Sequence, residues 1–213
     1  MMRMFRRSRG RLTLCLTTLS LTLALAAVAS PGSDARAGAA PGGGAVAFDR
    51  AAPPDTVPDL DGFRARIYHE GRLYIGGQPD SLALRALADR GVTAVVNLRT
   101  PGEMDDRARV PFDEQALARE LGLDYVWIPL GGDDHPYTPA AVDTFAAALE
   151  RHPGPVLLHC TVGWRASHMW AAYLVRHAGF AVDEAYARGV AIGIGEPPLA
   201  ELLDMELILT AKP

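Results

Sequence analysis

The chain has 213 residues, a formal net charge of −4 and two cysteines, Cys15 and Cys160. An acidic chain without a basic stripe is not typical of nucleic-acid-binding proteins, so we expect no nucleic-acid partner. Cys15 lies in an N-terminal apolar segment. Once that segment is removed, Cys160 has no partner for an intramolecular disulfide.

Residues 1–37 have the pattern of a secretory signal peptide. Residues 1–11 contain five arginines and no acid, residues 12–29 are almost wholly apolar, and Ala35-Arg36-Ala37 offers small residues at a cleavage point. Removal of this segment, whose net charge is +5, leaves a mature chain of −9. We therefore expect a periplasmic or secreted protein. The alternative is an uncleaved membrane anchor, because an apolar run of 18 residues is at the lower limit of a membrane span.

The rest of the chain divides into a linker and one domain. Residues 38–58 are rich in Gly, Ala, Pro and Asp and contain few large apolar side chains, which is typical of a flexible linker. Residues 59–213 are enough for a single domain with one core.

Within the domain, strand patterns alternate with helix patterns. The chain order is strands 65–68 and 72–75, a helix from an Asp80 cap to Gly91, strand 92–98, loop 99–103, helix 112–121, strand 124–130, loop 131–137, a helix after Thr138 with Pro139 at its first position, strand 156–159, and helices 166–177, 183–191 and 198–209. Continuous apolar strands that alternate with helices indicate a sheet covered on both faces. We predict an α/β fold with a central, mostly parallel sheet of about four to five strands flanked by helices.

Cys160 is the candidate nucleophile. It follows the apolar run Val156-Leu157-Leu158-His159 and precedes a helix pattern by a few residues. Backbone N–H groups and the positive end of the helix dipole favour a thiolate at such a position. The N–H groups of the next four residues would form an anion cradle, and Arg165 would clamp a phosphoryl group. The cradle residues are Thr161, Val162, Gly163 and Trp164.

Thiolate attack on a phosphate ester also needs a proton donor for the leaving group. Asp133 and Asp134 follow a predicted strand end and are the candidate general acids, with His135 as a third candidate. An exposed acidic turn before a capped helix is the structural alternative for these residues. Arg99 and Glu103 follow another strand end, where they would line the pocket or form an ion pair within the loop.

Three residues around Cys160 have both a functional and a structural interpretation. His159 would hold the loop by a hydrogen bond, or be a core histidine. Ser167 would donate to the departing sulfur, or belong only to the first turn of the helix. Trp164 would form a wall for a flat substrate, or pack on the domain. The six histidines show no metal-ligand spacing, so we expect neither a metal nor an organic cofactor.

Three segments in this order resemble the cysteine-dependent protein tyrosine and dual-specificity phosphatases. The first is Gly76-Gly77-Gln78-Pro79, the second is Val95-Val96-Asn97-Leu98-Arg99 with Glu103, and the third runs from Val156 to Cys160 and on to Gly163 and Arg165. They are most similar to the bacterial branch related to the beta-lactamase-hydrolase-like phosphatase domains. The resemblance implies a phosphatase-like fold, a nucleophile at Cys160, phosphate binding by Arg165 and the loop, and an upstream Asp acid.

On this basis we expect an exported phosphatase that acts on phosphate monoesters through a phosphocysteine. Its partner would be a phosphorylated protein, such as one with phosphotyrosine, or a small phosphate ester, and it would meet a membrane only if the leader stays uncleaved. Four residues separate Cys160 from Arg165, one fewer than in the phosphatase signature, and this spacing resembles the active loop of rhodanese-type sulfurtransferases. Two alternatives therefore stay open: a sulfurtransferase with a persulfide on Cys160, and a non-catalytic phosphate-binding module.

Overall fold

The computed structural model describes residues 48–195 and 197–206. The chain divides into two units, Met1–Ala39 and Ala40–Pro213, and every described residue belongs to the second. The predicted signal peptide and the first ten residues of the predicted linker lie outside the described residues. In the described ranges, no helix is long and apolar enough to cross a membrane.

The domain is built on a mixed sheet of six strands within the described residues, with the order β1-β2-β3-β6-β4-β5. β3, β6, β4 and β5 run parallel, whereas β1 and β2 add an antiparallel edge. The α/β fold with a mostly parallel sheet is confirmed, and the two short edge strands account for the larger strand count. The strands are β1 (Asp55–Thr56), β2 (Tyr68–Glu70), β3 (Leu73–Gly76), β4 (Ala94–Asn97), β5 (Asp124–Trp127) and β6 (Val156–His159).

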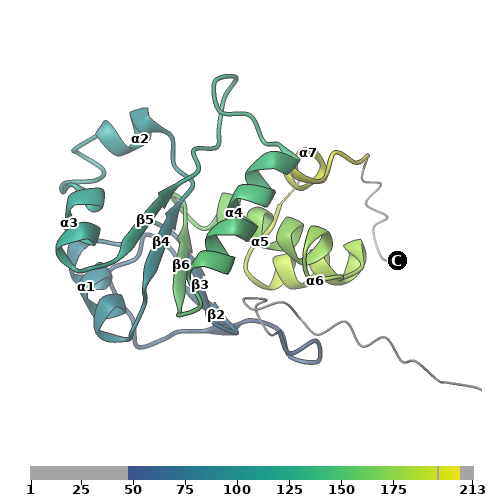
Figure 1. Cartoon of the computed structure of the whole chain (residues 1–213), viewed down its shortest axis with the longest axis horizontal. Coiled ribbons are helices and arrows are strands. Elements are labelled where there is room, and N and C mark those ends of the chain that lie inside the picture. Colours follow the sequence, from purple (N-terminus) through teal and green to yellow (C-terminus); the bar gives the residue numbers. More distant parts are fainter. Residues whose placement is uncertain (1–47, 196, 207–213) are drawn as a thin grey trace, which may run out of the picture. The chain divides into compact units, whose positions relative to one another are not determined.

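Helices cover both faces of the sheet (Figure 1). α1 and α3 lie on one face, and α4, α5, α6 and α7 form the other layer. The helices are α1 (Ser81–Asp89), α2 (Pro101–Asp105), α3 (Glu114–Glu120), α4 (Pro139–Arg151), α5 (Trp164–Arg176), α6 (Val182–Ala191) and α7 (Leu199–Leu203).

The pleat of the central strands divides the core into two clusters. Val95 and Leu157 pack with Leu84 of α1 on one face. On the other face, Val96 and Leu158 belong to the larger cluster, which also contains residues of α4, α5 and α7. Successive side chains of a strand point to opposite faces, so the apolar runs of β4 and β6 supply both clusters at once. Burial on both faces fixes the register of these strands, and with it the place where β6 ends.

Helix starts follow the cap residues in the sequence, with one local difference. Asp80 accepts hydrogen bonds from the backbone N–H groups of Leu82 and Ala83, and Thr138 caps α4 with Pro139 in its first turn. Residues 99–103, predicted as a loop, contain the start of the short helix α2. A capping box between Thr100 and Glu103, with Pro101 at the first position, stabilises this turn.

The described part of the predicted linker, residues 48–58, contacts the domain. Phe48 packs edge-to-face against Tyr173 and Phe180, with ring centroids 6.2 Å and 6.1 Å apart. Asp55–Thr56 pairs with β2 as the edge strand β1. The ring contacts of Phe48 and the short pairing of β1 with β2 thus attach this segment to the domain, although its composition predicts a linker.

Candidate active site

Cys160 stands at the point where three parallel strands end. β6 lies between β3 and β4 in the sheet, and Cys160 directly follows its last residue, His159. The segments after β3 and β4 therefore flank Cys160 on either side, and ligands of parallel sheets bind beyond this edge. The backbone N–H of Cys160 donates to Gly76 O at 3.3 Å, and Cys160 is buried.

Two glycines let the loop after Cys160 lie close to the segment after β3. Gly163 has a φ of +88° and precedes α5 without a side-chain cap, and a Cβ there would meet the carbonyl carbon of Gly76 at 3.4 Å. A Cβ on Gly77 would come within 3.1 Å of Thr161 O. The turn therefore depends on glycine at both sites. Since α5 begins at once, its first N–H groups have no intrahelical partner and remain available to an anion.

Arg165 folds back over the loop and is held by four residues. Its Nη2 donates to Glu103 Oε1 at 2.6 Å and to Thr161 Oγ1 at 3.0 Å. Its Nη1 donates to Glu103 Oε2 at 2.7 Å, to Leu130 O at 2.6 Å and to Leu98 O at 3.2 Å. The two Nη atoms of Arg165, which were expected to bind a phosphate, thus donate to the Glu103 carboxylate. Arg165 Nε makes no hydrogen bond within the described residues.

Glu103 is the carboxylate that fixes this fork. Burial opposes ionisation of Glu103, but hydrogen bonds from Arg165, Thr161 and the Thr100 backbone outweigh it and hold its pKa far below the usual value. Burial also opposes the charge of Arg165, yet the bonds to Glu103 and the nearby Cys160 and Glu103 charges raise the Arg165 pKa. The pair is therefore fully ionised at neutral pH, and the guanidinium orientation is fixed before any ligand binds.

A second buried carboxylate, Glu114 of α3, supports His159, the residue before Cys160. Glu114 Oε1 lies 3.0 Å from His159 Nε2 and accepts from the Tyr125 hydroxyl at 2.9 Å. The Gln78 side-chain amide also donates to Glu114. Burial raises the Glu114 pKa, but the His159 charge and these hydrogen bonds outweigh it, so the net shift is downward.

Arg99 links the two carboxylates instead of lining an open pocket. Its side chain is fully buried, and Nη1 donates to Gln78 Oε1 at 2.6 Å. Nη2 donates to Glu103 O at 3.1 Å, and Nε lies 3.6 Å from Glu103 Oε1. A continuous polar network therefore runs from Arg165 through Glu103, Arg99 and Gln78 to Glu114 beneath the loop.

Ser167, His159, Val162 and Trp164 take different places around Cys160. Ser167 is buried and its hydroxyl donates to Trp164 O at 2.8 Å. His159 is buried against Glu114, as described above. Val162 is 55% exposed, which leaves an apolar side chain on the loop surface. The Trp164 ring is partly buried and packs edge-to-face on His168, with centroids 4.9 Å apart.

The loop with Asp133 and Asp134 reaches the site only at its base. Leu130 O accepts from Arg165, and Gly131 N donates to His135 O at 2.7 Å, which closes the loop above that point. Asp133 and Asp134 are exposed in the projecting segment between β5 and α4 (Figure 1). Neither carboxylate has a hydrogen bond or ion pair with another residue of the described ranges.

The sequence pattern did not single out three contributors to the site. Glu114 and Tyr125 come from α3 and β5, and no local motif connects them to His159. Tyr137 is the third: it packs against the core cluster that contains Cys160, and burial raises its pKa, with further effects of the Arg165 and Cys160 charges. Thr161 was predicted for its N–H alone, whereas its hydroxyl also donates to Glu103 at 2.6 Å. Over the described residues, no group of three or more His, Cys, Asp or Glu side chains is placed to hold a metal ion.

Residues 72–176 match the family described as beta-lactamase hydrolase-like protein, phosphatase-like domain. This match places residues 72–176 in the cysteine-dependent phosphatase superfamily, in this bacterial branch. A beta-lactamase hydrolase-like protein of Xylella fastidiosa (strain 9a5c) is 33% identical over 141 residues, which is 66% of this chain and 32% of that protein. The chain thus spans about a third of the length of this relative.

Two solved structures have the same fold. The putative phosphatase (DUF442) of Shewanella putrefaciens CN-32 is 27% identical with a TM-score of 0.53, covering 68% of this chain and 91% of that one. TpbA of P. aeruginosa, solved in complex with pTyr, is 21% identical with a TM-score of 0.51, covering 67% and 82%. The phosphatase-like domain therefore holds Cys160 and Arg165 in a fold shared with phosphatases.

Proposed function

We propose that this domain hydrolyses phosphate monoesters through a phosphocysteine intermediate on Cys160. The observation that carries the proposal is Arg165, which is folded over the Cys160 loop and fixed there by Glu103 and Thr161. A cation held next to a nucleophile, above uncapped helix N–H groups, is arranged for a phosphoryl group. The match to a phosphatase-like family supports the same reaction class.

In the first step, the Cys160 thiolate attacks phosphorus, an S–P bond forms and the ester P–O bond breaks. The N–H groups of the loop and Arg165 Nε bind the equatorial oxygens, where negative charge is spread in the transition state. In the second step, water attacks phosphorus, the S–P bond breaks, and inorganic phosphate leaves while the thiolate is restored. These two steps as written use water and the phosphate ester, with no oxidant, reductant or cofactor.

The leaving oxygen must take up a proton, and we assign this to Asp133 or Asp134. The base of their loop is fixed by the hydrogen bond from Arg165 to Leu130 O, so closure of the exposed segment over a bound ester would bring a carboxylic acid to the leaving group. The same carboxylate would accept the proton of the attacking water in the second step. Apo geometry is often looser than that of the complex.

The remaining predicted site residues take supporting roles in this proposal. Arg99 positions Glu103 and Gln78 instead of touching the ester, since its guanidinium is buried between them. His159 fixes the strand end through Glu114, and Ser167 fixes the first turn of α5 through Trp164 O. Val162 and Trp164 supply apolar surface at the site for the group that carries the phosphate.

For the substrate, we propose phosphotyrosine or a related aryl ester. TpbA, a structural neighbour, was solved with pTyr, and Trp164 offers an aromatic surface for a flat leaving group. We further propose export to the periplasm or beyond, based on the leader pattern of residues 1–37.

Hydrolysis of an aryl phosphate by the reduced full-length protein tests the proposal. We expect turnover by the wild type, loss of turnover in Cys160→Ser with an unchanged circular dichroism spectrum, and a phosphate adduct on Cys160 after rapid acid quench. Absence of wild-type turnover, or turnover by Cys160→Ser at the wild-type rate, would contradict it.

The four-residue gap between Cys160 and Arg165 keeps a sulfurtransferase as a second candidate. Attack of the Cys160 thiolate on the outer sulfur of thiosulfate would then break the S–S bond of thiosulfate and release sulfite, which adds the mass of one sulfur atom to wild type and not to Cys160→Ser. An unmodified mass counts against this candidate. Phosphate binding that survives Cys160→Ala, without turnover of either substrate, would indicate a binding module.

A further inference from the structure

A groove beside the Cys160 loop combines arginine and aromatic side chains. Its volume is about 320 Å³, near the lower end of small-ligand pockets. Gln78 is one of its lining residues, and the Gln78 backbone N–H donates to Thr161 O at 3.1 Å. Gln78 therefore connects the groove to the anion loop, although the residues that line the groove do not include those of the loop. Its lining residues are Gly62, Phe63, Arg64, Gln78, Pro79, Asp80, Arg109, Pro111 and Phe112.

Arg64 supplies the groove with an exposed positive charge. Its backbone N–H donates to Gln78 O at 3.0 Å, which ties the residue to the segment after β3. Its side chain is exposed and makes no hydrogen bond or ion pair with any residue in the described ranges. An anchored backbone with an unpaired guanidinium is suited to capture an anion.

The two other charged residues of the groove have bonding partners, although the Asp80 carboxylate keeps its negative charge. Arg109 Nε lies 3.2 Å from Asp106 Oδ2 in an exposed pair. Asp80 Oδ1 accepts the N–H groups of Leu82 and Ala83 at the start of α1, at 2.9 Å and 2.8 Å. The side chains of Phe63 and Phe112 add an apolar surface to the groove. We therefore expect Arg64 to bind an anionic group. The two phenylalanines would contact an apolar or aromatic part of the same ligand.

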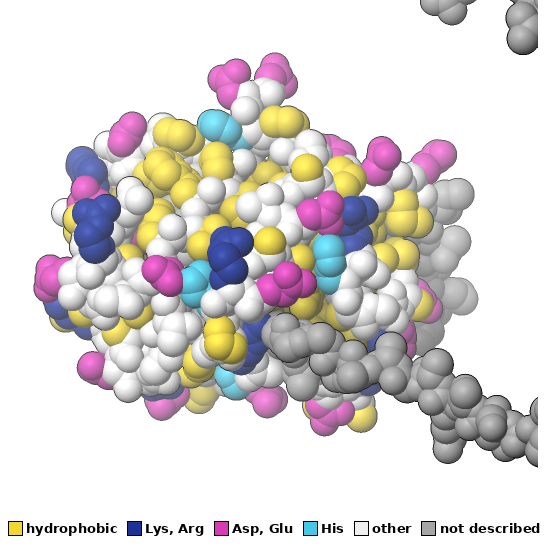
Figure 2. Space-filling view, in the orientation of Figure 1, with side chains coloured by type: hydrophobic (Ala, Val, Ile, Leu, Met, Phe, Trp, Pro, Cys, Tyr) yellow, Lys and Arg dark blue, Asp and Glu magenta, His cyan; other side chains and the backbone are white. Residues whose placement is uncertain are grey.

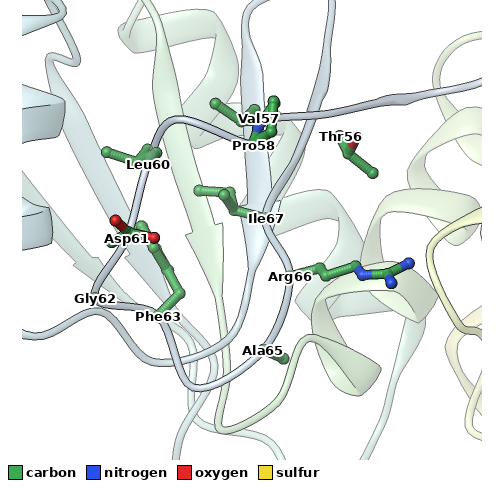
Figure 3. A pocket seen from close by; sticks show the side chains of 10 residues that line it. All are labelled: Thr56, Val57, Pro58, Leu60, Asp61, Gly62, Phe63, Ala65, Arg66 and Ile67. Atoms are coloured by element: carbon green, nitrogen blue, oxygen red, sulfur yellow. The ribbon is translucent and has the colours of Figure 1, made fainter.

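The neighbouring Arg66 faces a different environment, although only Ala65 separates it from Arg64. The chain bends at Arg64 and Ala65. Arg66 lines a separate cavity of about 590 Å³ with Leu60, Phe63 and Ile67, and Figure 3 shows its side chain pointing away from these residues. Arg66 also lines a cavity of about 80 Å³ with Val162 and Gly163 of the Cys160 loop, so the control for Arg64 must come from elsewhere in the chain.

We propose that the groove of Phe63, Arg64, Gln78, Arg109 and Phe112 binds a second anionic group on the substrate, beside the phosphate at Cys160. This inference rests on the proposed function and names its substrate class: phosphate monoesters that carry a further phosphate or carboxylate. The Cys160 loop holds the scissile phosphate, and Arg64 recognises the second anion. The overall acidic charge of the protein makes such local recognition necessary.

The test compares matched substrates that differ only in the second anion. One pair is phenyl phosphate and an aryl bisphosphate; the other is a phosphotyrosine peptide flanked by Glu and the same peptide flanked by Gln. In wild type we expect a KM about tenfold lower for the doubly anionic member of at least one pair, as one charge-assisted contact provides. The responding pair tells whether the second anion is a phosphate or a carboxylate.

Arg64→Ala should abolish that KM ratio, whereas Arg151→Ala, which removes the same charge from the exposed end of α4, should keep it. Equal KM values within both pairs in wild type, a ratio that persists in Arg64→Ala, or an equal loss in Arg151→Ala would overturn the inference. Calorimetric binding of both members of each pair to Cys160→Ser provides a readout without turnover. A difference there, without hydrolysis by wild type, would refute the proposed reaction and keep the groove.

Discussion

The two loops that meet at Arg165 are held in very different ways. The loop from Cys160 to Arg165 is tied to β3, to Glu103 and to the polar network beneath it. The loop of residues 131–137 shares only its base with this site, and its two aspartates are exposed. Figure 2 shows acidic side chains at the projecting top of the molecule, apart from the mixed surface below. In the proposed reaction, the phosphate-binding loop is therefore preorganised, whereas proton transfer would require the exposed segment to close.

Arg165→Lys removes the guanidinium that Glu103 holds in place, and we expect it to lower activity more than the variants that follow. A lysine keeps one positive charge but cannot bridge both oxygens of Glu103, so the loop loses its orientation. We expect kcat/KM for an aryl phosphate to fall by about 10²–10³-fold. Arg176→Lys, in the last turn of the same helix, is the control and should act like wild type. A loss below threefold in Arg165→Lys would show that the fork is dispensable.

The exposed loop is tested with Asp133→Asn and Asp134→Asn, each serving as the control for the other. The residue that acts as general acid should lower kcat by about 100-fold for a substrate with a poor leaving group, because that oxygen needs a proton. The loss should shrink for a leaving group that departs without one. Two variants with wild-type rates would remove both residues from the mechanism.

Glu103→Gln keeps Arg165 but removes the carboxylate that holds it, which should loosen the loop from Cys160 to Arg165. Loss of one member of a partly buried pair should destabilise the protein by about 2 kcal/mol at pH 7 and lower kcat/KM about tenfold. Because the folded-state pKa of Glu103 is depressed, its stabilisation is present above the ordinary value of 4.5 and is lost as the pH falls below it.

Urea unfolding of wild type and Glu103→Gln at several pH values measures this effect. The difference in unfolding free energy should narrow as the pH drops below about 4.5. Glu150→Gln on the exposed face of α4 is the charge-matched control and should show no such difference. A constant difference across this range would mean that the Glu103 charge does not stabilise the loop.

The smallest expected effect concerns His168, beneath Trp164. Burial lowers the pKa of His168 to about 4, and neither ring nitrogen has a hydrogen-bond partner among the described residues. The unfolded chain takes up a proton near pH 6.5 while the folded chain does not, so stability should decrease as the pH falls from about 6.5 to about 4. A proton NMR titration of the His168 ring checks this directly, and a midpoint near 6.5 would contradict it.

Local sequence signals predicted the scaffold of the site well. The apolar run 156–159, the glycine at 163 and the helix start after it placed Cys160 between β6 and α5. Asp80, Thr138 and Pro139 marked helix starts because capping is decided within one turn of the chain. The same locality explains the difference at α2, where the Thr100–Glu103 capping box outweighs the glycine and proline that indicate a loop.

The surroundings of Cys160 became visible only in the folded structure. The amino-acid sequence was enough to predict the α/β order, the place of Cys160 between a strand and a helix, and the nearness of Arg165 to it. It did not determine that Arg165 would face Glu103, 62 residues away, or that Glu114, 45 residues before His159, would support it. Those pairs form because parallel strands β3, β6 and β4 bring distant segments to one edge of the sheet, and no local pattern encodes which side chains meet there.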